Sequence, residues 1–265
     1  MKTLVFSDVH LPVDGGGSAS QVRFIEFLRG IDPAEADRVI VLGDLFDFWF
    51  EYRHVVFSGY FEVLRALAAL RDGGVELHFV CGNHDFWAGR FLRDQLGFTL
   101  HPGETILPFG SERVLLHHGD GLNPADWSYR LYKRIARTRP VIGAFRLLHP
   151  DWAMRIAQLV SHGSRSFHNT DVSKGHEIAP LRQFARRALA EGRADVVMCG
   201  HCHYPIHETY ETPHGQGRYI NTGDWLYHGS FAEWEDGRFR LLLWDKEPQE
   251  IPCDERGRAE EEARQ

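Results

Sequence analysis

Residues 3–10 read TLVFSDVH, an apolar run that ends in a carboxylate and an imidazole separated by one residue. A short apolar run of this kind predicts a strand that is buried on both faces. In an extended Asp8-Val9-His10 segment, the two polar side chains would leave the same face of the strand end. We therefore expect Asp8 and His10 to reach one metal ion.

The same pattern, an apolar run that closes on a short polar motif, occurs four more times. The runs are RVIVL (38–42), ELHFV (76–80), RVLLH (113–117) and DVVMC (195–199). The motifs are Gly43-Asp44, Gly82-Asn83-His84-Asp85, His117-His118-Gly119-Asp120 and Gly200-His201-Cys202-His203. Because the active sites of α/β sheets gather beyond the carboxyl ends of the strands, these loops are expected to converge. Their carboxylate, imidazole and amide groups suit Mn, Fe, Zn or Mg in a hydrolytic site.

Glycines and spacing refine this set of candidate ligands. Glycine precedes Asp44, Asn83 and His201, where it allows two backbones to approach closely. His201 and His203 have the same spacing as the first motif and could reach one ion, although their loop can also turn them toward neighbouring ions.

The order of these elements predicts one large α/β domain, for which 265 residues are sufficient. Helices are expected near 20–30 and 59–72, and the second has Phe61, Leu64, Leu67 and Leu70 on one face. Within SFAEWEDGRFRLLLW (230–244), Asp236-Gly237 predicts a hairpin. Strands with intervening helices, followed by a hairpin, predict a layered α/β sandwich with mixed β-sheets flanked by helices.

Composition limits the function classes. The net charge of -7 does not favour a nucleic-acid binder. No run approaches the roughly 18 apolar residues that a membrane span needs, and MKTLVFSDVH does not resemble a secretory signal. Four cysteines in a chain of this size do not suggest a disulfide framework. We expect a cytoplasmic protein.

Residues 124–174 form a distinct segment with helical periodicity and nine Lys or Arg against three Asp. Trp127, Leu131 and Ile135 share one helix face, and Tyr132 and Phe145 add aromatic surface. An apolar face edged with cations could bind an acylated, anionic ligand and rest on anionic lipid. The alternative is a helical hairpin packed on the core with a solvated basic face. The domain is expected to span 1–245, with a disordered tail at 246–265.

Two other patterns overlap the last motif. Cys199-Gly200-His201-Cys202-His203 also matches a C-x-x-C redox pair and a C-x-x-C-H haem attachment motif. Haem attachment needs an exported chain, which is not expected here. A redox pair would open a helix, whereas Tyr204-Pro205-Ile206 predicts a loop. We therefore expect Cys199 to pack in a strand and Cys202 to fill space between ligands.

The series D-x-H, GD, GNHD, HGD and GHxH resembles the calcineurin-like metallophosphoesterase family over residues 8–203. The resemblance implies two divalent cations, with Mn favoured and Fe, Zn or Mg as alternatives. It implies a first ion held by Asp8, His10 and His203, a second held by Asn83, His118 and His201, and a bridging Asp44. It also implies that His84 stabilises the phosphorus centre or protonates the leaving group, and that Asp85 orients His84.

The family pattern also selects between the neighbouring histidines 117 and 118. The ligand directly precedes Gly-Asp in the family, which selects His118. Strand alternation points His117 to the other face, so a packed or surface histidine is expected there.

A narrower resemblance concerns the substrate. GDLFDFWF (43–50), GNHDFW (82–87), HHGDGL (117–122), the helical insertion and NTGDW (221–225) resemble UDP-2,3-diacylglucosamine pyrophosphate hydrolases of lipid A synthesis. Those enzymes release UMP and a diacylated glucosamine phosphate at the cytoplasmic face of the inner membrane, and the insertion is their lid. The resemblance implies that the substrate contacts are Asn83, His84, Asp126, Tyr129, Arg165, Asn169 and Lys174. Better-known members have Arg in place of His84, and an imidazole can donate a proton but cannot form a two-point fork.

Two other function classes compete with this interpretation. One is a general metallophosphoesterase for soluble phosphodiesters or nucleotides, which would have no use for an apolar, cationic insertion. The other is a non-enzymatic metal-bound scaffold, which the seven filled ligand positions disfavour. Neither a nucleic-acid partner nor an obligate protein partner is expected.

Overall fold

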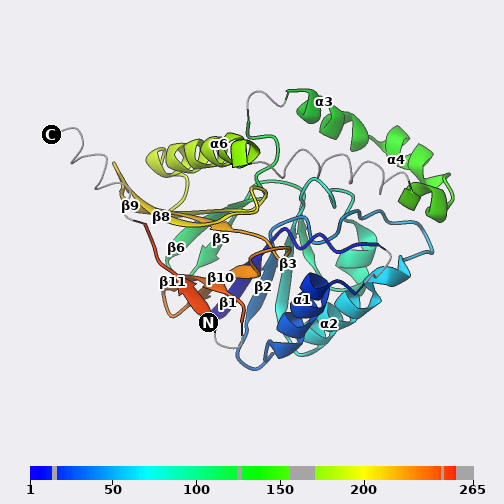
Figure 1. Ribbon diagram of the computed structural model, residues 1–265, viewed down its shortest axis with the longest axis horizontal. Coiled ribbons are helices and arrows are strands. Elements are labelled where there is room, and N and C mark those ends of the chain that lie inside the picture. The colour runs from blue at the N-terminus through cyan, green and yellow to red at the C-terminus, as the bar shows by residue number, and fades with distance from the viewer. Residues whose placement is uncertain (14–16, 124–126, 156–170, 246–247, 255–265) are drawn as a thin grey trace.

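The computed structural model describes residues 1–13, 17–123, 127–155, 171–245 and 248–254 (Figure 1). It has two β-sheets. The first has the strand order β12-β11-β10-β1-β2-β3-β4, formed by β1 (Lys2–Phe6), β2 (Arg38–Val41), β3 (Glu76–Val80), β4 (Thr99–His101), β10 (Ser230–Glu235), β11 (Arg238–Leu243) and β12 (Gln249–Ile251). The second has the order β5-β6-β7-β9-β8, formed by β5 (Thr105–Phe109), β6 (Glu112–His117), β7 (Val196–Cys199), β8 (Pro205–Thr212) and β9 (Gly215–Thr222).

Both sheets mix parallel and antiparallel pairs, which confirms the predicted sheet class. Strands β1, β2, β3 and β4 are parallel, whereas β10 pairs antiparallel with β1. In the second sheet β6, β7 and β9 are parallel. Asp236-Gly237 forms the turn between β10 and β11, as the sequence predicts.

Alternating side chains of each strand serve two apolar layers. Val5, Ile40 and Met198 belong to the buried layer between the two sheets. Leu4 and Phe6 point instead to the helices that cover the first sheet, α1 (Ala19–Gly30) and α2 (Phe61–Asp72). The outer face of the second sheet packs on α6 (Asp171–Ala190). The result is a layered sandwich with helices on both outer faces (Figure 1).

Helix α2 departs from the sequence prediction at its first residue. Phe61 is 61% exposed, and the buried face consists of Val63, Leu64, Ala66, Leu67 and Leu70. A short 3₁₀ turn, Ser58–Tyr60, precedes the helix and buries Tyr60 in place of Phe61.

The described part of the 124–174 insertion is helical. It includes α3 (Trp127–Ala136) and α4 (Arg139–Arg146), which lie beyond the sandwich at the upper right of Figure 1. Phe145 of α4 packs on Phe50 and Trp87, with ring centroids 4.6 and 4.9 Å apart, so α4 is anchored to the core domain. A single π-helical turn, Phe91–Gln95, follows Trp87.

The prediction of a disordered tail from 246 is wrong for residues 248–254. Strand β12 pairs with β11, and Asp254 exchanges backbone hydrogen bonds with His207 and Thr209. An edge strand needs few apolar residues of its own, because β11 satisfies its backbone groups. Residues 255–265 lie outside the described part of the chain. Within that part, no helix is long and apolar enough to cross a bilayer.

Candidate metal centre

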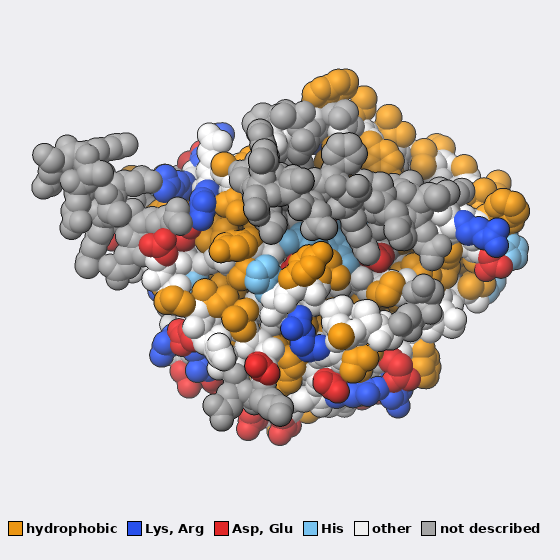
Figure 2. Space-filling model, in the orientation of Figure 1, with side chains coloured by type: hydrophobic (Ala, Val, Ile, Leu, Met, Phe, Trp, Pro, Cys, Tyr) orange, Lys and Arg blue, Asp and Glu red, His pale blue; other side chains and the backbone are white. Residues whose placement is uncertain are grey.

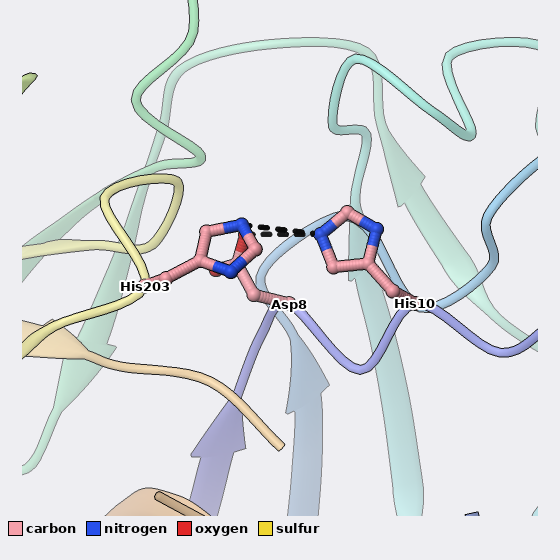
Figure 3. A group of neighbouring side chains, drawn as sticks. All are labelled: Asp8, His10 and His203. Carbon is pink, nitrogen blue, oxygen red and sulfur yellow. Dashed lines mark hydrogen bonds and ion pairs between the residues drawn. The ribbon is translucent and has the colours of Figure 1, made fainter. Parts of the chain in front are cut away.

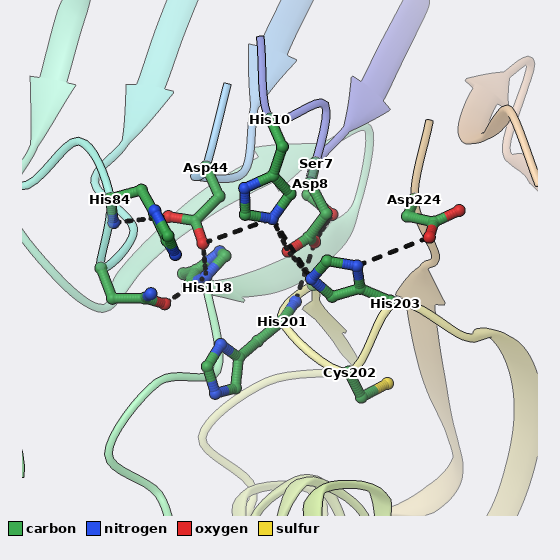
Figure 4. Close-up of polar contacts among 12 residues, drawn as sticks. Ser7, Asp8, His10, Asp44, His84, His118, His201, Cys202, His203 and Asp224 are labelled. Atoms are coloured by element: carbon green, nitrogen blue, oxygen red, sulfur yellow. Dashed lines mark hydrogen bonds and ion pairs between the residues drawn. The ribbon is translucent and has the colours of Figure 1, made fainter. Parts of the chain in front are cut away.

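The candidate ligands lie in loops that directly follow five strands. Asp8 and His10 follow β1, Asp44 follows β2, and Asn83 follows β3. His118 follows β6, and His201 and His203 follow β7. Because these strands are parallel within each sheet and their carboxyl ends lie at one edge of the sandwich, the loops meet there (Figure 4).

Asp8, His10 and His203 form a first cluster (Figure 3). The two Nε2 atoms of the histidines are 3.2 Å apart. Asp8 Oδ1 lies 3.5 Å from His203 Nε2 and 3.9 Å from His10 Nε2. Asp8 Oδ1 is buried and has no hydrogen-bond partner among the described residues. A buried carboxylate oxygen without a partner is costly, which suits a cation at this point.

The Nδ1 atoms of the two rings face carboxylates, which fix the tautomers. Asp47 Oδ1 lies 3.3 Å from His10 Nδ1, and Asp224 Oδ2 lies 3.5 Å from His203 Nδ1. A carboxylate favours the proton on the nitrogen that faces it, so each Nε2 carries a lone pair. Two lone pairs and one carboxylate oxygen then converge on the same space. This donor set fits a divalent cation.

Asp44, His118 and His201 form a second cluster. His118 Nδ1 donates to the carbonyl of Leu42 at 2.8 Å, so its Nε2 is free to act as a ligand. This Nε2 lies 3.2 Å from Asn83 Oδ1 and 3.2 Å from Asp44 Oδ2.

Asp44 lies between the two clusters. Its Oδ2 is 3.2 Å from His118 Nε2 in one cluster and 3.9 Å from His10 Nε2 in the other. Its Oδ1 accepts a hydrogen bond from the backbone N–H of His84 at 2.9 Å, which fixes the carboxylate plane. This placement is compatible with the bridging role that the sequence resemblance implies.

The carboxylates create a field that favours positive charge in this space. Burial opposes a charge on His118, but Asp44 and Asp8 raise its pKa to about 10. Burial and the neighbouring His118 lower the pKa of His201 to about 3, which keeps that ring neutral. A neutral imidazole is the form that binds a metal ion.

Backbone strain is concentrated at the candidate ligands. Five of them have a positive φ between 50° and 72°, namely Asp8, His10, Asp44, His201 and His203. Residues other than glycine rarely adopt this region, and such strain is typical of functional sites. The extended Asp8-Val9-His10 segment expected from the sequence is therefore wrong. β1 ends at Phe6, and two left-handed residues turn the side chains into the site.

Three glycines allow the loops to touch. A Cβ atom at Gly43 would overlap His118 Nδ1, and one at Gly82 would overlap Asp44 Oδ1. A Cβ atom at Gly200 would overlap Ser7 Oγ and lie 2.5 Å from Asp8 Oδ2. The close approach predicted for the residues before Asp44, Asn83 and His201 is thus confirmed.

Comparison with known proteins gives the family of this arrangement. The sequence model of the calcineurin-like phosphoesterases matches residues 1–205. The chain belongs to this family. It is 32% identical to a UDP-2,3-diacylglucosamine hydrolase of Aeromonas salmonicida, over 91% of this chain and 92% of that protein. It is 30% identical to one of Porphyromonas gingivalis, over 76% of this chain and 81% of that protein.

Among solved structures, a phosphoesterase from E. coli aligns with 95% of this chain and 98% of its own at 15% identity. The TM-score is 0.47, which adds nothing to the assignment. Family membership makes the chain a metal-dependent phosphoesterase. Divalent cations in such a site polarise the phosphoryl oxygens and lower the pKa of the attacking water.

In this phosphoesterase, His84 stands at the edge of both clusters. Its ring centroid is 4.8 Å from that of His10, and its Nδ1 donates to the carbonyl of Asp47 at 2.8 Å. That hydrogen bond occupies Nδ1 and leaves Nε2 as the other ring nitrogen. This position is compatible with the role toward a phosphoryl group that the resemblance implies.

The expectation that Asp85 orients His84 is wrong. Its buried carboxylate accepts hydrogen bonds from the backbone N–H groups of Gly82 and Leu45, both at 2.8 Å. Burial and the nearby Asp44 raise the pKa of Asp85 to about 7. Asp85 therefore joins the loops after β2 and β3, whereas Asp47 orients His84.

Sequence reasoning missed two carboxylates behind the histidines. Asp47 belongs to GDLFD and Asp224 to NTGDW, so both stood in quoted motifs without a role. Asp224 lies in the loop after β9 and faces His203 (Figure 4). It also accepts a hydrogen bond from His228 Nδ1 at 3.0 Å. Two signals in the sequence could have pointed to them. One is a second Asp three residues after Asp44, and the other is another Gly-Asp pair near a strand end.

The third missed carboxylate, Asp120, connects the site with the insertion. Its buried side chain accepts from the hydroxyl of Tyr129 at 2.6 Å and forms an ion pair with Lys133. Tyr129, expected to contact substrate, has its hydroxyl engaged by Asp120.

The other predicted substrate contacts cannot be placed. Asp126, Arg165 and Asn169 lie outside the described residues. Lys174 belongs to helix α6, where its side chain is not described.

The remaining residues of the motifs are packed. His117 lies against Phe184, with ring centroids 5.5 Å apart, and its Nδ1 accepts from the N–H of Gly119. Cys199 and Cys202 are buried in the apolar layer beneath α6. The predicted loop at 204–206 is only partly correct, because β8 begins at Pro205.

Proposed function

We propose that this phosphoesterase cleaves the pyrophosphate of UDP-2,3-diacylglucosamine to UMP and 2,3-diacylglucosamine 1-phosphate in lipid A synthesis. The names of the relatives support this substrate class. The proposed metals are two divalent cations, with Mn favoured, held by Asp8, His10, Asp44, Asn83, His118, His201 and His203. His84 is the proposed catalytic residue, and residues 124–174 are the proposed lid.

The observation that carries the proposal is the orientation of α3. Tyr129 and Lys133 turn inward onto Asp120, whereas the large apolar side chains turn outward. Trp127 is 66% exposed and Leu131 50% exposed. A helix packed on an aqueous protein surface normally has the reverse arrangement. An outward apolar face suits a ligand with acyl chains.

A cleft that adjoins the loop of the Gly82–Asp85 motif, at Phe86 and Trp87, offers room for such chains. It has a volume of about 1090 Å³ and lies between residues 49–57, residues 86–95 and the insertion. Its lining includes Phe50, Phe86 and Trp87 from the core domain and Ile142 from α4. Pockets for small organic ligands are lined in the same way, by aromatic and apolar side chains with a few polar groups.

The outer surface of the insertion supports contact with the cytoplasmic face of the inner membrane. Figure 2 shows apolar side chains gathered over α3 and α4. Trp152 is 63% exposed, and the guanidinium of Arg155 lies 5.9 Å from its ring centroid. Interfacial aromatic side chains with adjacent cations favour an anionic lipid surface. The substrate would be drawn directly from that surface.

The test compares matched substrates with the Mn-loaded enzyme. UDP-2,3-diacylglucosamine in detergent micelles is compared with UDP-N-acetylglucosamine, which has the pyrophosphate but lacks the long acyl chains. Burial of only five methylenes, at about 0.8 kcal/mol each, corresponds to roughly 10³-fold in kcat/KM. We expect at least that preference, with release of UMP and the acylated sugar phosphate. Hydrolysis of soluble phosphodiesters or nucleotides without cleavage of the lipid substrate would instead indicate a general metallophosphoesterase.

A further inference from the structure

Two buried hydrogen-bond donors in the cleft lack a partner among the residues that the structure describes. They are the guanidinium of Arg137, through Nε and Nη2, and the hydroxyl of Tyr52. Leaving a buried polar group unpaired costs about 1–3 kcal/mol, and more when it is charged. Such a cost is tolerated where a ligand supplies the missing acceptors.

Arg137 lines the cleft next to the loop that carries the Gly82–Asp85 motif. It directly follows α3, and its guanidinium carbon is 5.6 Å from the ring centroid of Phe86. Phe86 comes immediately after the Gly82–Asp85 motif of the metal centre. The adjacent Trp87 donates its indole N–H to the carbonyl of Ala136 at 3.0 Å, which fixes the end of α3 on this loop.

The carboxylates that line the cleft are committed elsewhere. Glu51 accepts from the backbone N–H groups of Gly89 and Phe91, both at 2.8 Å. Asp94 pairs with Arg93 at 2.7 Å. Among the described residues, Nε and Nη2 of Arg137 are therefore left available for an external anion.

His84 alone cannot form two hydrogen bonds with a phosphate. Its Nδ1 is already bound to Asp47, so only Nε2 remains. A guanidinium is planar and can bind two phosphate oxygens at once. Both unpaired groups of the cleft are hydrogen-bond donors, which favours a ligand with acceptor oxygens and negative charge. The aromatic lining of the cleft favours a ligand that also has an apolar part.

We propose that Arg137 binds the phosphate of the acylated sugar half of the substrate, while Tyr52 donates to another oxygen of the same half. This inference rests on the proposed function and deepens it. The diacylated sugar phosphate then lies on the insertion side of the metal centre, and the uridine half lies away from the cleft. Arg137 would therefore contact the phosphate of the acylated product and not the phosphate of UMP.

The test measures product affinities with a reporter substrate. Hydrolysis of bis(p-nitrophenyl) phosphate is inhibited either by 2,3-diacylglucosamine 1-phosphate or by UMP, each in the same detergent. Arg137→Gln should raise the inhibition constant of the lipid product about 10-fold or more, the usual effect of losing one charge-assisted contact. The constant for UMP should change less than about 2-fold, which is below the effect of one hydrogen bond.

Three further variants sharpen the measurement. Arg134→Gln removes an exposed cation from the last turn of α3, close to Arg137 in the sequence, and should leave both constants unchanged. Arg137→Lys keeps the charge without the planar fork and should give an intermediate shift for the lipid product alone. Tyr52→Phe should also weaken only the lipid product. Inhibition constants do not depend on the fraction of folded enzyme, so partial misfolding of one variant does not mask the result.

Two outcomes would overturn the inference. One is equal weakening of both products by Arg137→Gln, and the other is no weakening of the lipid product. The reporter assay does not require cleavage of the lipid substrate. Failure of the proposed function would appear separately, as intact enzyme that does not cleave UDP-2,3-diacylglucosamine.

Discussion

Nε2 of His10 and Nε2 of His203 lie 3.2 Å apart, although 193 residues separate the two histidines in the chain. Each ring faces a carboxylate through its other nitrogen, Asp47 in one case and Asp224 in the other. Both Nε2 atoms therefore present lone pairs to each other. Two lone pairs at this distance repel each other unless a cation or a proton lies between them, which leads to the first prediction.

The purified protein should bind two divalent cations per chain, with Mn favoured. Carboxylate, imidazole and amide groups form both clusters, and Cys202 is packed away from them. Because the ions bind the folded state, removal by a chelator should lower the melting temperature, and Mn should restore it. Elemental analysis and thermal unfolding measure these effects. One tightly bound ion and an empty second site under saturating Mn would contradict the prediction.

Asp44→Ala should reduce activity more than Asp8→Ala. The carboxylate of Asp44 contacts both clusters, whereas Asp8 belongs to the first cluster only. Loss of Asp44 should lower the occupancy of both ions, while loss of Asp8 should spare the second. Metal content and kcat of the two variants are compared at equal Mn concentration. Near-normal activity of Asp44→Ala beside an inactive Asp8→Ala would make the bridging assignment wrong.

His84→Ala should lower kcat roughly 10²–10⁴-fold with both metals retained, because the proposed role of its ring is to assist the reacting phosphate rather than to hold an ion. His214→Ala, at the turn between β8 and β9, is the control for removal of an exposed histidine and should be neutral. Rates on the lipid substrate and metal content are measured together. If His84→Ala loses a metal ion, His84 is a ligand rather than a catalytic group.

Gly82→Ala should abolish most of the activity although glycine itself carries no chemistry. The new methyl group would overlap Asp44 Oδ1 and lie 2.6 Å from Asp44 N, so the two loops must separate. Displacement of a reacting group by about 1 Å can cost about 10²-fold in rate. Gly103→Ala is the control, because its added Cβ would meet nothing within 4 Å. Equal activity of the two variants would show that the two loops can move apart without loss of activity.

Removal of the apolar face of α3 should affect only the lipid substrate. The double variant Trp127→Ala and Leu131→Ala should lower kcat/KM for UDP-2,3-diacylglucosamine about 10- to 100-fold, which corresponds to about 1.5–3 kcal/mol for one large apolar contact. Hydrolysis of bis(p-nitrophenyl) phosphate should be nearly unchanged. Phe61→Ala, which removes an exposed aromatic ring from α2, is the matched control. Equal loss on both substrates would mean that this face of α3 supports the fold.

Much of the fold was predictable because its signals are local. The apolar runs at 3–7, 38–42 and 76–80 are buried on both faces, apart from the exposed Glu76, and each became a parallel strand. The hairpin β8–β9 was not predicted, since its polar sequence satisfies backbone groups through pairing rather than through an apolar run. Strand β12 escaped notice for the same reason.

The residue types of the metal centre, and the glycines beside them, were determined by the sequence alone. A metal site needs particular ligand atoms. The residues that carry these atoms can be recognised in the sequence, namely Asp8, His10, Asp44, Asn83, His118, His201 and His203. The family resemblance of the sequence also implied how these side chains divide between two ions. Only the tertiary structure decided which carboxylates stand behind the histidine rings. It also decided that Asp85 joins two loops and that Arg137 faces the cleft without a counter-ion among the described residues. These relationships depend on how the two sheets pack and on contacts between loops that are far apart in the chain. No local sequence pattern specifies the distances between such loops.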